Sequence, residues 1–196
     1  MKKYTALLLM NLLLSSLSIC LSQTTIINPA NATGTSGADG SFQNATNTFA
    51  ANAWNVVNAA TNQWFVGTTS FCAGTKGAYI GTATGNNNYT NTTAQVSHFY
   101  KDVTFPAGQT CITLSFSWKC AGESSFDGIR VSLGSTSVLP VANTVFTTSD
   151  PSAIQLGNAF YNNNTTCNTA TITIPAANAG TTKRLVFSWI NDGSVG

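Results

Sequence analysis

Charge is scarce in this sequence. Lysine, arginine, aspartate and glutamate together make up 7% of its 196 residues, whereas about a quarter is usual for a soluble domain. So few cations cannot build the basic surface that neutralises nucleic-acid phosphates, and we expect no nucleic-acid partner. Solubility must come from Asn, Thr, Ser and Gly. This composition suits an extracellular protein that faces glycans or belongs to a larger assembly.

Long hydrophobic runs are also missing. No stretch approaches the roughly 20 apolar residues that a membrane-spanning helix needs, so we expect no transmembrane segment. The longest apolar run, within residues 6–14, follows Lys2 and Lys3 and precedes small polar residues and a possible cut after Ser22. This layout is typical of a secretory signal peptide over residues 1–22 and predicts a secreted or cell-surface protein.

Removal of the signal leaves six cationic and six acidic residues, so the mature chain carries a formal charge near zero. Cys20 offers an alternative, because a lipidated cysteine would anchor the protein to a membrane. However, Ile19 stands where that processing usually needs a small residue. Secretion is therefore preferred over lipoprotein anchoring at Cys20.

Helical periodicity is weak throughout, and a short helical turn is expected only within residues 144–157. The apolar pattern instead has a period of two, which is typical of strands. In the clearest case Ile112, Leu114, Phe116 and Trp118 alternate with polar residues, which places four large side chains on one face of a strand. Strands are predicted over residues 63–68, 77–82, 96–105, 111–119, 129–133, 169–174 and 185–189.

Turn-rich stretches separate these strands, at residues 85–88, 106–108, 149–151 and 162–164. Short strands divided by turns predict an all-β fold, a jelly-roll-like antiparallel β-sandwich. We expect a single domain over residues 40–196, preceded by a polar leader over residues 23–39.

A family resemblance runs through residues 40–131. Its segments are GSFQ at 40–43, FAANAWNVVN at 49–58, NQWFVG at 62–67, GAYI at 77–80, HFYKDV at 98–103, LSFSW at 114–118 and DGIRV at 127–131. This pattern of aromatics and glycines resembles the MAM-like and cleaved-adhesin jelly-roll modules of large secreted Bacteroidetes surface proteins. The resemblance implies a surface adhesion or accessory module, followed by further domains of the same polypeptide.

Two departures from that family matter. Gln43 stands where the family usually carries an acidic residue. The chain also stops at residue 196, just past a strong strand, where relatives continue into a final strand. The resemblance therefore implies a sandwich that lacks its last strand and exposes an unpaired edge.

Four cysteines remain after signal removal. An even number in an oxidising compartment predicts two disulfides among Cys72, Cys111, Cys120 and Cys167. Cys111 and Cys120 bracket one predicted strand and point to opposite faces, so they should not pair with each other. The other two pairing schemes stay open. A zinc site is disfavoured, because no pair has the close spacing of zinc ligands and His98 is the lone histidine.

Calcium is the candidate cofactor, because it prefers hard oxygen ligands on loops. The resemblance implies a structural calcium near the first strand and an acidic loop. The candidate ligands are Asp39, Gln43, Glu123 and Asp127, together with main-chain carbonyls. The alternative is that Glu123 and Asp127 are ordinary solvated loop residues.

Aromatic residues supply the candidate ligand contacts. The four tryptophans lie in alternating apolar patterns and are predicted to be mostly core. Tyr89 and Tyr161 lie in Asn-rich stretches, so we expect them to be exposed and available to a ligand.

The sequence favours a non-catalytic extracellular adhesion or glycan-binding module, whose partner is an unidentified glycan or protein. One alternative is an accessory domain of a secreted hydrolase whose catalytic part lies beyond residue 196. Another is a glycosidase, which would need a second carboxylate opposite Glu123 at roughly 5 to 10 Å. No nucleophile-elbow motif accompanies His98, so that residue is expected to be a packed or surface histidine.

Overall fold

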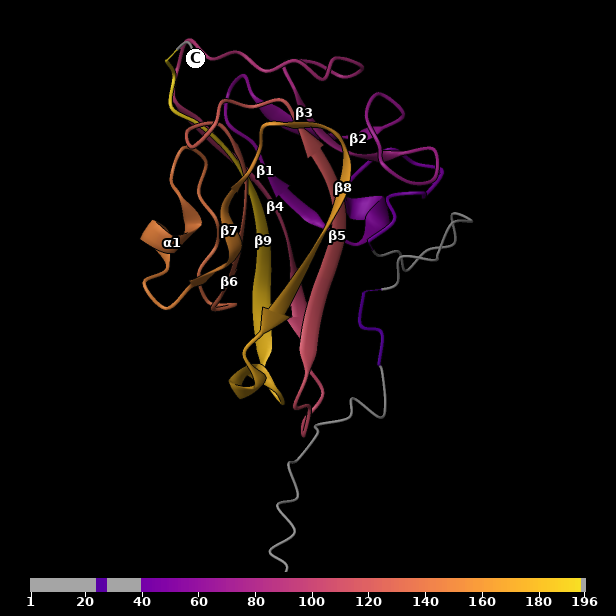
Figure 1. The fold of residues 1–196 in the computed structure, drawn as a ribbon, viewed down its shortest axis with the longest axis vertical. Helices are drawn as coiled ribbons and strands as arrows, with labels where there is room; N and C mark the ends of the chain where they lie inside the picture. Colours follow the sequence, from indigo (N-terminus) through magenta and orange to yellow (C-terminus); the bar gives the residue numbers. More distant parts are fainter. Residues whose placement is uncertain (1–23, 28–39, 195–196) are drawn as a thin grey trace, which may run out of the picture.

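The computed structural model describes residues 24–27 and 40–194 (Figure 1). The signal peptide predicted over residues 1–22, including Cys20, lies outside the described residues. So do Asp39 and most of the predicted leader. Within the described part of the chain, no helix is long and apolar enough to cross a membrane.

Strands dominate the described residues, and all the strand pairs are antiparallel. The predicted helical turn is the four-residue helix α1. The elements are η1 (Ala50–Asn52), β1 (Asn55–Val57), β2 (Gln63–Gly67), β3 (Gly77–Gly81), β4 (Gln95–Thr104), β5 (Ile112–Cys120), β6 (Gly128–Gly134), α1 (Phe146–Ser149), β7 (Ile154–Tyr161), β8 (Asn164–Ile174), η2 (Ala176–Asn178) and β9 (Thr182–Asn191).

The strands form two main layers. One layer is a five-stranded sheet in the order β1-β4-β9-β6-β7, and the β5–β8 pair lies in front of it (Figure 1). A separate β2–β3 hairpin lies toward the end of the molecule where β5 finishes. This arrangement confirms the predicted all-β antiparallel sandwich. β9 lies at the centre of the large sheet, between β4 and β6.

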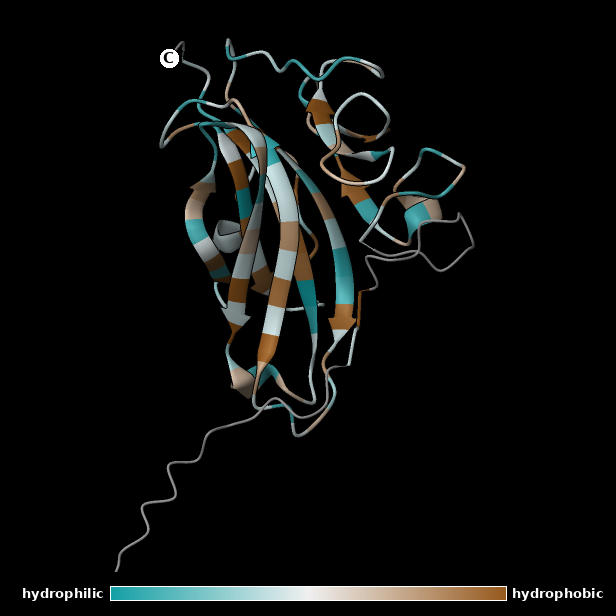
Figure 2. Ribbon diagram, turned by 45° about the vertical axis from the view of Figure 1, so that its right-hand side comes forward, coloured by the Kyte–Doolittle hydropathy of each residue, from teal (hydrophilic) through white to brown (hydrophobic). Residues whose placement is uncertain are grey.

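The core follows from the period-two pattern, which appears as alternating colours along the strands in Figure 2. In β9 the inward residues Leu185, Phe187 and Trp189 are all buried. Phe187 stacks on Phe99 of the neighbouring strand β4, with ring centroids 4.9 Å apart. Each such side chain contributes about 1.5 to 3 kcal/mol by leaving water. Three of the four tryptophans are buried as predicted, and Trp118 is partly buried.

The outer face of the large sheet carries a second buried layer. His98 and Val186 are fully buried there, where α1 and its flanking loops cover the sheet. The Nδ1 atom of His98 accepts a hydrogen bond from the Ser188 hydroxyl at 2.8 Å, and its Nε2–H faces the carbonyls of Val141 and Thr144 at 3.1 Å. The histidine is therefore packed in the structure, and burial lowers its pKa.

The cysteine prediction needs correction. One disulfide joins Cys72, in the β2–β3 connection, to Cys167 of β8. Cys111 is an exposed free thiol and Cys120 a buried one, so both pairing schemes left open by the sequence are wrong. The prediction that Cys111 and Cys120 do not pair with each other is confirmed. They stand at opposite ends of β5, and nine residues of extended chain span about 30 Å.

Candidate metal centre

The loop between β5 and β6 carries the acidic residues predicted from the sequence. Its turn is closed by hydrogen bonds from the amides of Phe126 and Asp127 to the carbonyl of Glu123, at 3.3 and 3.0 Å. Gly122 allows this turn, because a Cβ atom there would collide with the Asp127 carbonyl. The tight turn brings Glu123 close to Asp127 immediately before β6 begins.

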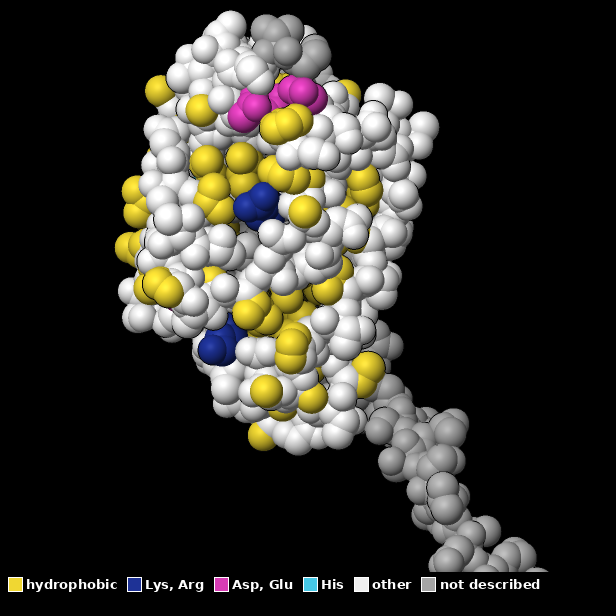
Figure 3. All heavy atoms as spheres, turned by 60° about the vertical axis from the view of Figure 1, so that its left-hand side comes forward, with side chains coloured by type: hydrophobic (Ala, Val, Ile, Leu, Met, Phe, Trp, Pro, Cys, Tyr) yellow, Lys and Arg dark blue, Asp and Glu magenta, His cyan; other side chains and the backbone are white. Residues whose placement is uncertain are grey.

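Three carboxylates meet at this end of the sandwich. Oxygens of Glu123, Asp127 and Asp192 lie within 4.8 Å of one another. Asp192 comes from a distant part of the sequence, because it follows β9, and β9 pairs with β6 so that Ile190 lies opposite Gly128. In the view of Figure 3 the visible acidic side chains gather at this one end of the molecule.

Neutral donors hold the cluster in place. Asp127 is 1% exposed, and its two carboxylate oxygens accept hydrogen bonds from the Tyr89 hydroxyl at 2.7 Å and the Asp192 amide at 3.0 Å. The Asn162 side chain donates to the carbonyls of Glu123 and Asp127 at 2.6 and 2.8 Å. The Tyr89–Asp127 contact has an electrostatic consequence: burial, and then the hydrogen bond to Asp127, raise the pKa of Tyr89.

Among the described residues, no Lys or Arg forms an ion pair with the cluster. Within residues 24–27 and 40–194, the one ion pair joins Arg184 to Asp102 elsewhere on the large sheet. In addition, the Oε2 atom of Glu123 is buried and has no hydrogen-bond partner. A buried carboxylate oxygen without a partner is costly, by about 1 to 3 kcal/mol or more. A bound cation would satisfy that oxygen and offset the repulsion among the three carboxylates.

The donor set suits a hard cation. All three cluster side chains offer oxygen, which calcium prefers. Cys120 is the nearest thiol in sequence, but its sulfur is not among the three ligand atoms that meet here, and burial raises its pKa to about 11. His98 is engaged on the outer face of the sheet. The residues present therefore fit calcium better than zinc.

The predicted ligand set is only partly brought together. Gln43 instead joins two chain segments, since its amide donates to the carbonyls of Ser41 and Lys76 and accepts from Thr75. No described contact links Gln43 to the carboxylates, and Asp39 lies outside the described residues. Sequence reasoning did not include Asp192 among the candidate residues of this acidic cluster. Only knowledge that β9 pairs with β6 could have placed it beside Asp127.

The two predicted ligand tyrosines differ in outcome. Tyr161 is 3% exposed, and its ring packs edge-on against Phe116 and Trp118. The expectation that it is exposed is wrong, because it ends β7 rather than lying in a loop. Tyr89 is half-buried against Trp189 and holds Asp127 through its hydroxyl. Its structural role is thus to support the acidic cluster.

Comparison with known proteins gives no family assignment. No protein-family description, curated protein or solved structure matches this chain.

Proposed function

We propose that this chain is a non-catalytic extracellular adhesion or glycan-binding module with a structural calcium ion at one end of its sandwich. The observation that carries the calcium proposal is the buried, unpartnered Oε2 atom of Glu123 within a cluster of three carboxylates. Calcium would join the β5–β6 loop to the end of β9. It would then stabilise the loops at that end, where an adhesion module commonly presents its ligand-binding surface.

The distribution of acidic groups supports a non-catalytic role. Glycoside hydrolysis needs two carboxylates facing a cleft that admits the sugar. Among the described residues, no Asp or Glu lines either the cleft beside β5 or the pocket beside β7. The clustered acids include Asp127, which is almost completely buried. Their placement favours cation binding over acid–base chemistry.

Calcium titration by isothermal calorimetry tests this proposal. We expect the wild-type protein to bind one calcium ion, and Asp127→Asn and Asp192→Asn to weaken binding at least tenfold because each removes an anionic ligand. Asp102→Asn is the matched control, since the same chemical change at the Arg184 ion pair should leave calcium affinity within about twofold. Equal losses in all three variants would contradict the assignment.

A glycan array then tests the ligand class. Calcium-loaded protein should bind one class of immobilised glycan without releasing free sugar. Release of free sugar would show that the module is an enzyme. Absence of any binding would direct the search to protein ligands.

A further inference from the structure

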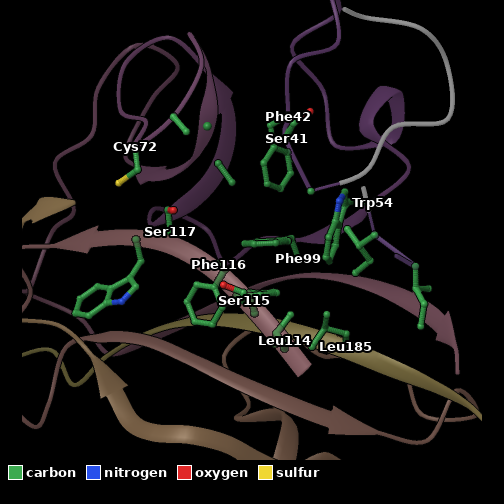
Figure 4. A pocket seen from close by; sticks show the side chains of 18 of the residues that line it. Ser41, Phe42, Trp54, Cys72, Phe99, Leu114, Ser115, Phe116, Ser117 and Leu185 are labelled. Atoms are coloured by element: carbon green, nitrogen blue, oxygen red, sulfur yellow. The ribbon is translucent and has the colours of Figure 1, made fainter. Parts of the chain in front are cut away.

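The two layers of the sandwich are unequal, and this leaves β5 with a free edge. β5 pairs with β8 along one edge, and no other strand within the described ranges pairs with its opposite edge. The facing sheet has five strands. A cleft of about 940 Å³ opens beside β5, between it and the first part of the domain (Figure 4).

Aromatic rings line part of this cleft. Figure 4 shows the rings of Phe42 and Phe116, which are partly buried, and those of Trp54 and Phe99, which belong to the buried core. On β5 itself, Leu114, Phe116 and Trp118 are only partly buried against the core, whereas Ser115 and Ser117 are exposed. The strand therefore presents a half-covered apolar face next to an unpaired backbone edge.

The free edge decides what kind of molecule fits. Backbone N–H and C=O groups along an unpaired strand can bond to water, and a ligand that covers the edge and excludes this water must supply the hydrogen-bond partners itself. An alkyl chain would cover the aromatic wall but leave those groups without partners. A peptide in extended conformation satisfies both, because its backbone pairs with β5 and its alternate side chains enter the cleft.

Charge defines the peptide further. Lys76 and Lys119 line the cleft, and no acidic residue among the described ones does so. The Lys76 ammonium donates to the carbonyls of Asn44 and Ala45, at 2.8 and 3.2 Å, and these groups carry no charge. A carboxylate on the incoming peptide would complement this positive rim.

The cleft already accommodates a short piece of peptide. Residues 24–27 of this chain line it, and Ile27 packs against the hydrophobic core. An aliphatic side chain on a separate segment can therefore reach the aromatic wall from the open side.

We propose that the free edge of β5 accepts a strand from a partner protein, with apolar residues at alternate positions and a carboxylate near Lys119. This proposal goes beyond the adhesion function and does not depend on the metal site. It makes the module a receptor for an extended peptide segment, which would lengthen the β5–β8 layer by one strand.

The test uses synthetic nine-residue peptides and the whole chain saturated with calcium. The probe alternates valine and threonine, has blocked ends, and carries aspartate at its N-terminal end, which lies beside Lys119 if pairing is antiparallel. Two control peptides carry N-methyl groups on alternate backbone amides, one for each edge of the strand. Binding is followed by tryptophan fluorescence and by hydrogen exchange of the β5 amides.

We expect the probe to bind and to protect β5 amides. One N-methylated control should lose at least tenfold in affinity, because its methyl groups block pairing with β5, while the other binds normally. Lys119→Ala should lower the affinity for the probe a few-fold. The same variant should bind a probe with asparagine in place of aspartate as tightly as the wild-type protein does.

Three results with added ligands would overturn the proposal. These are absence of probe binding, equal binding of both N-methylated peptides, and saturation of the cleft by dodecanoic acid with no effect of peptide. Peptide-independent dimers in sedimentation, protected at the same β5 amides, would likewise show that a second copy covers the edge. None of these results bears on calcium binding, which the calorimetric titration measures separately.

Discussion

At the scale of single residues, His98 shows how burial controls protonation. The imidazole is fully buried, accepts a hydrogen bond from Ser188 and donates to backbone carbonyls on the covering loop. Its pKa is lowered mainly by burial, although the two carbonyl contacts oppose the shift. The folded protein therefore holds the neutral form at pH values where the unfolded chain already takes up a proton.

This linkage predicts a loss of stability in mild acid. The contribution of His98 is complete above its unfolded pKa of about 6.5 and decreases as the pH falls below it. Urea unfolding should thus give a lower free energy at pH 5.5 than at pH 7.5. His98→Gln should remove most of this difference, because the chain has one histidine and glutamine does not titrate. The idea fails if wild type and variant depend equally on pH.

The acidic cluster shows the limits of sequence reasoning at this scale. Glu123 and Asp127 could be selected from the sequence because they are close together on one predicted loop. Asp192 could not, because 65 residues separate it from Asp127 and strand pairing alone joins them. Tyr161 was misplaced for a related reason: its Asn-rich surroundings suggested a loop, whereas its ring fills the core.

At the scale of secondary structure, strands with a regular alternation of apolar and polar residues could be predicted. Strands that are short or locally irregular could not. The predicted ranges for β4, β5 and β9 lie over the observed strands. β7 was missed because its apolar alternation is interrupted at Gly157, which has a positive φ of 67°. The pairing of β7 with β6 shifts register in the same region, between Ile129 and Val131 of β6. β1 was missed because three residues are too few to show a period.

The disulfide ties two such elements together. Cys72 and Cys167 connect the β2–β3 loop to β8 across 95 residues of sequence. A cross-link of that length restricts the unfolded chain and contributes about 2 to 5 kcal/mol to stability. The β2–β3 hairpin makes few other pairings. The disulfide should therefore matter most for holding this hairpin in its position.

We predict that the double variant Cys72→Ser, Cys167→Ser unfolds at lower denaturant concentration, with a loss of about 2 to 5 kcal/mol. Cys111→Ser is the matched control, because that thiol is exposed and free, and it should change stability by less than about 0.5 kcal/mol. Chemical denaturation of both variants gives the comparison. A double variant as stable as the control would show that the bond contributes nothing.

At the scale of the whole molecule, composition and periodicity were enough to predict a sandwich but not its strand order. The central strands β4, β9 and β6 are far apart in the sequence, and no local signal encodes their pairing. That same pairing creates both sites described above. It carries Asp192 to the acidic loop, and it builds a five-stranded sheet that two strands only partly cover.

Calcium would act at this largest scale by joining chain segments that the backbone alone leaves separate. A ligand that binds only the folded state stabilises it by mass action. When the free calcium concentration is one hundred times the dissociation constant, the free energy of unfolding rises by about 2.7 kcal/mol. For a domain of this size that corresponds to a rise in melting temperature of several degrees.

Thermal melting of the wild-type protein in calcium and in EDTA tests the central claim most directly. We predict a melting temperature several degrees higher in calcium, and no such rise in Asp127→Asn. Identical melting curves for the wild-type protein under the two conditions would contradict a structural calcium site at Glu123, Asp127 and Asp192.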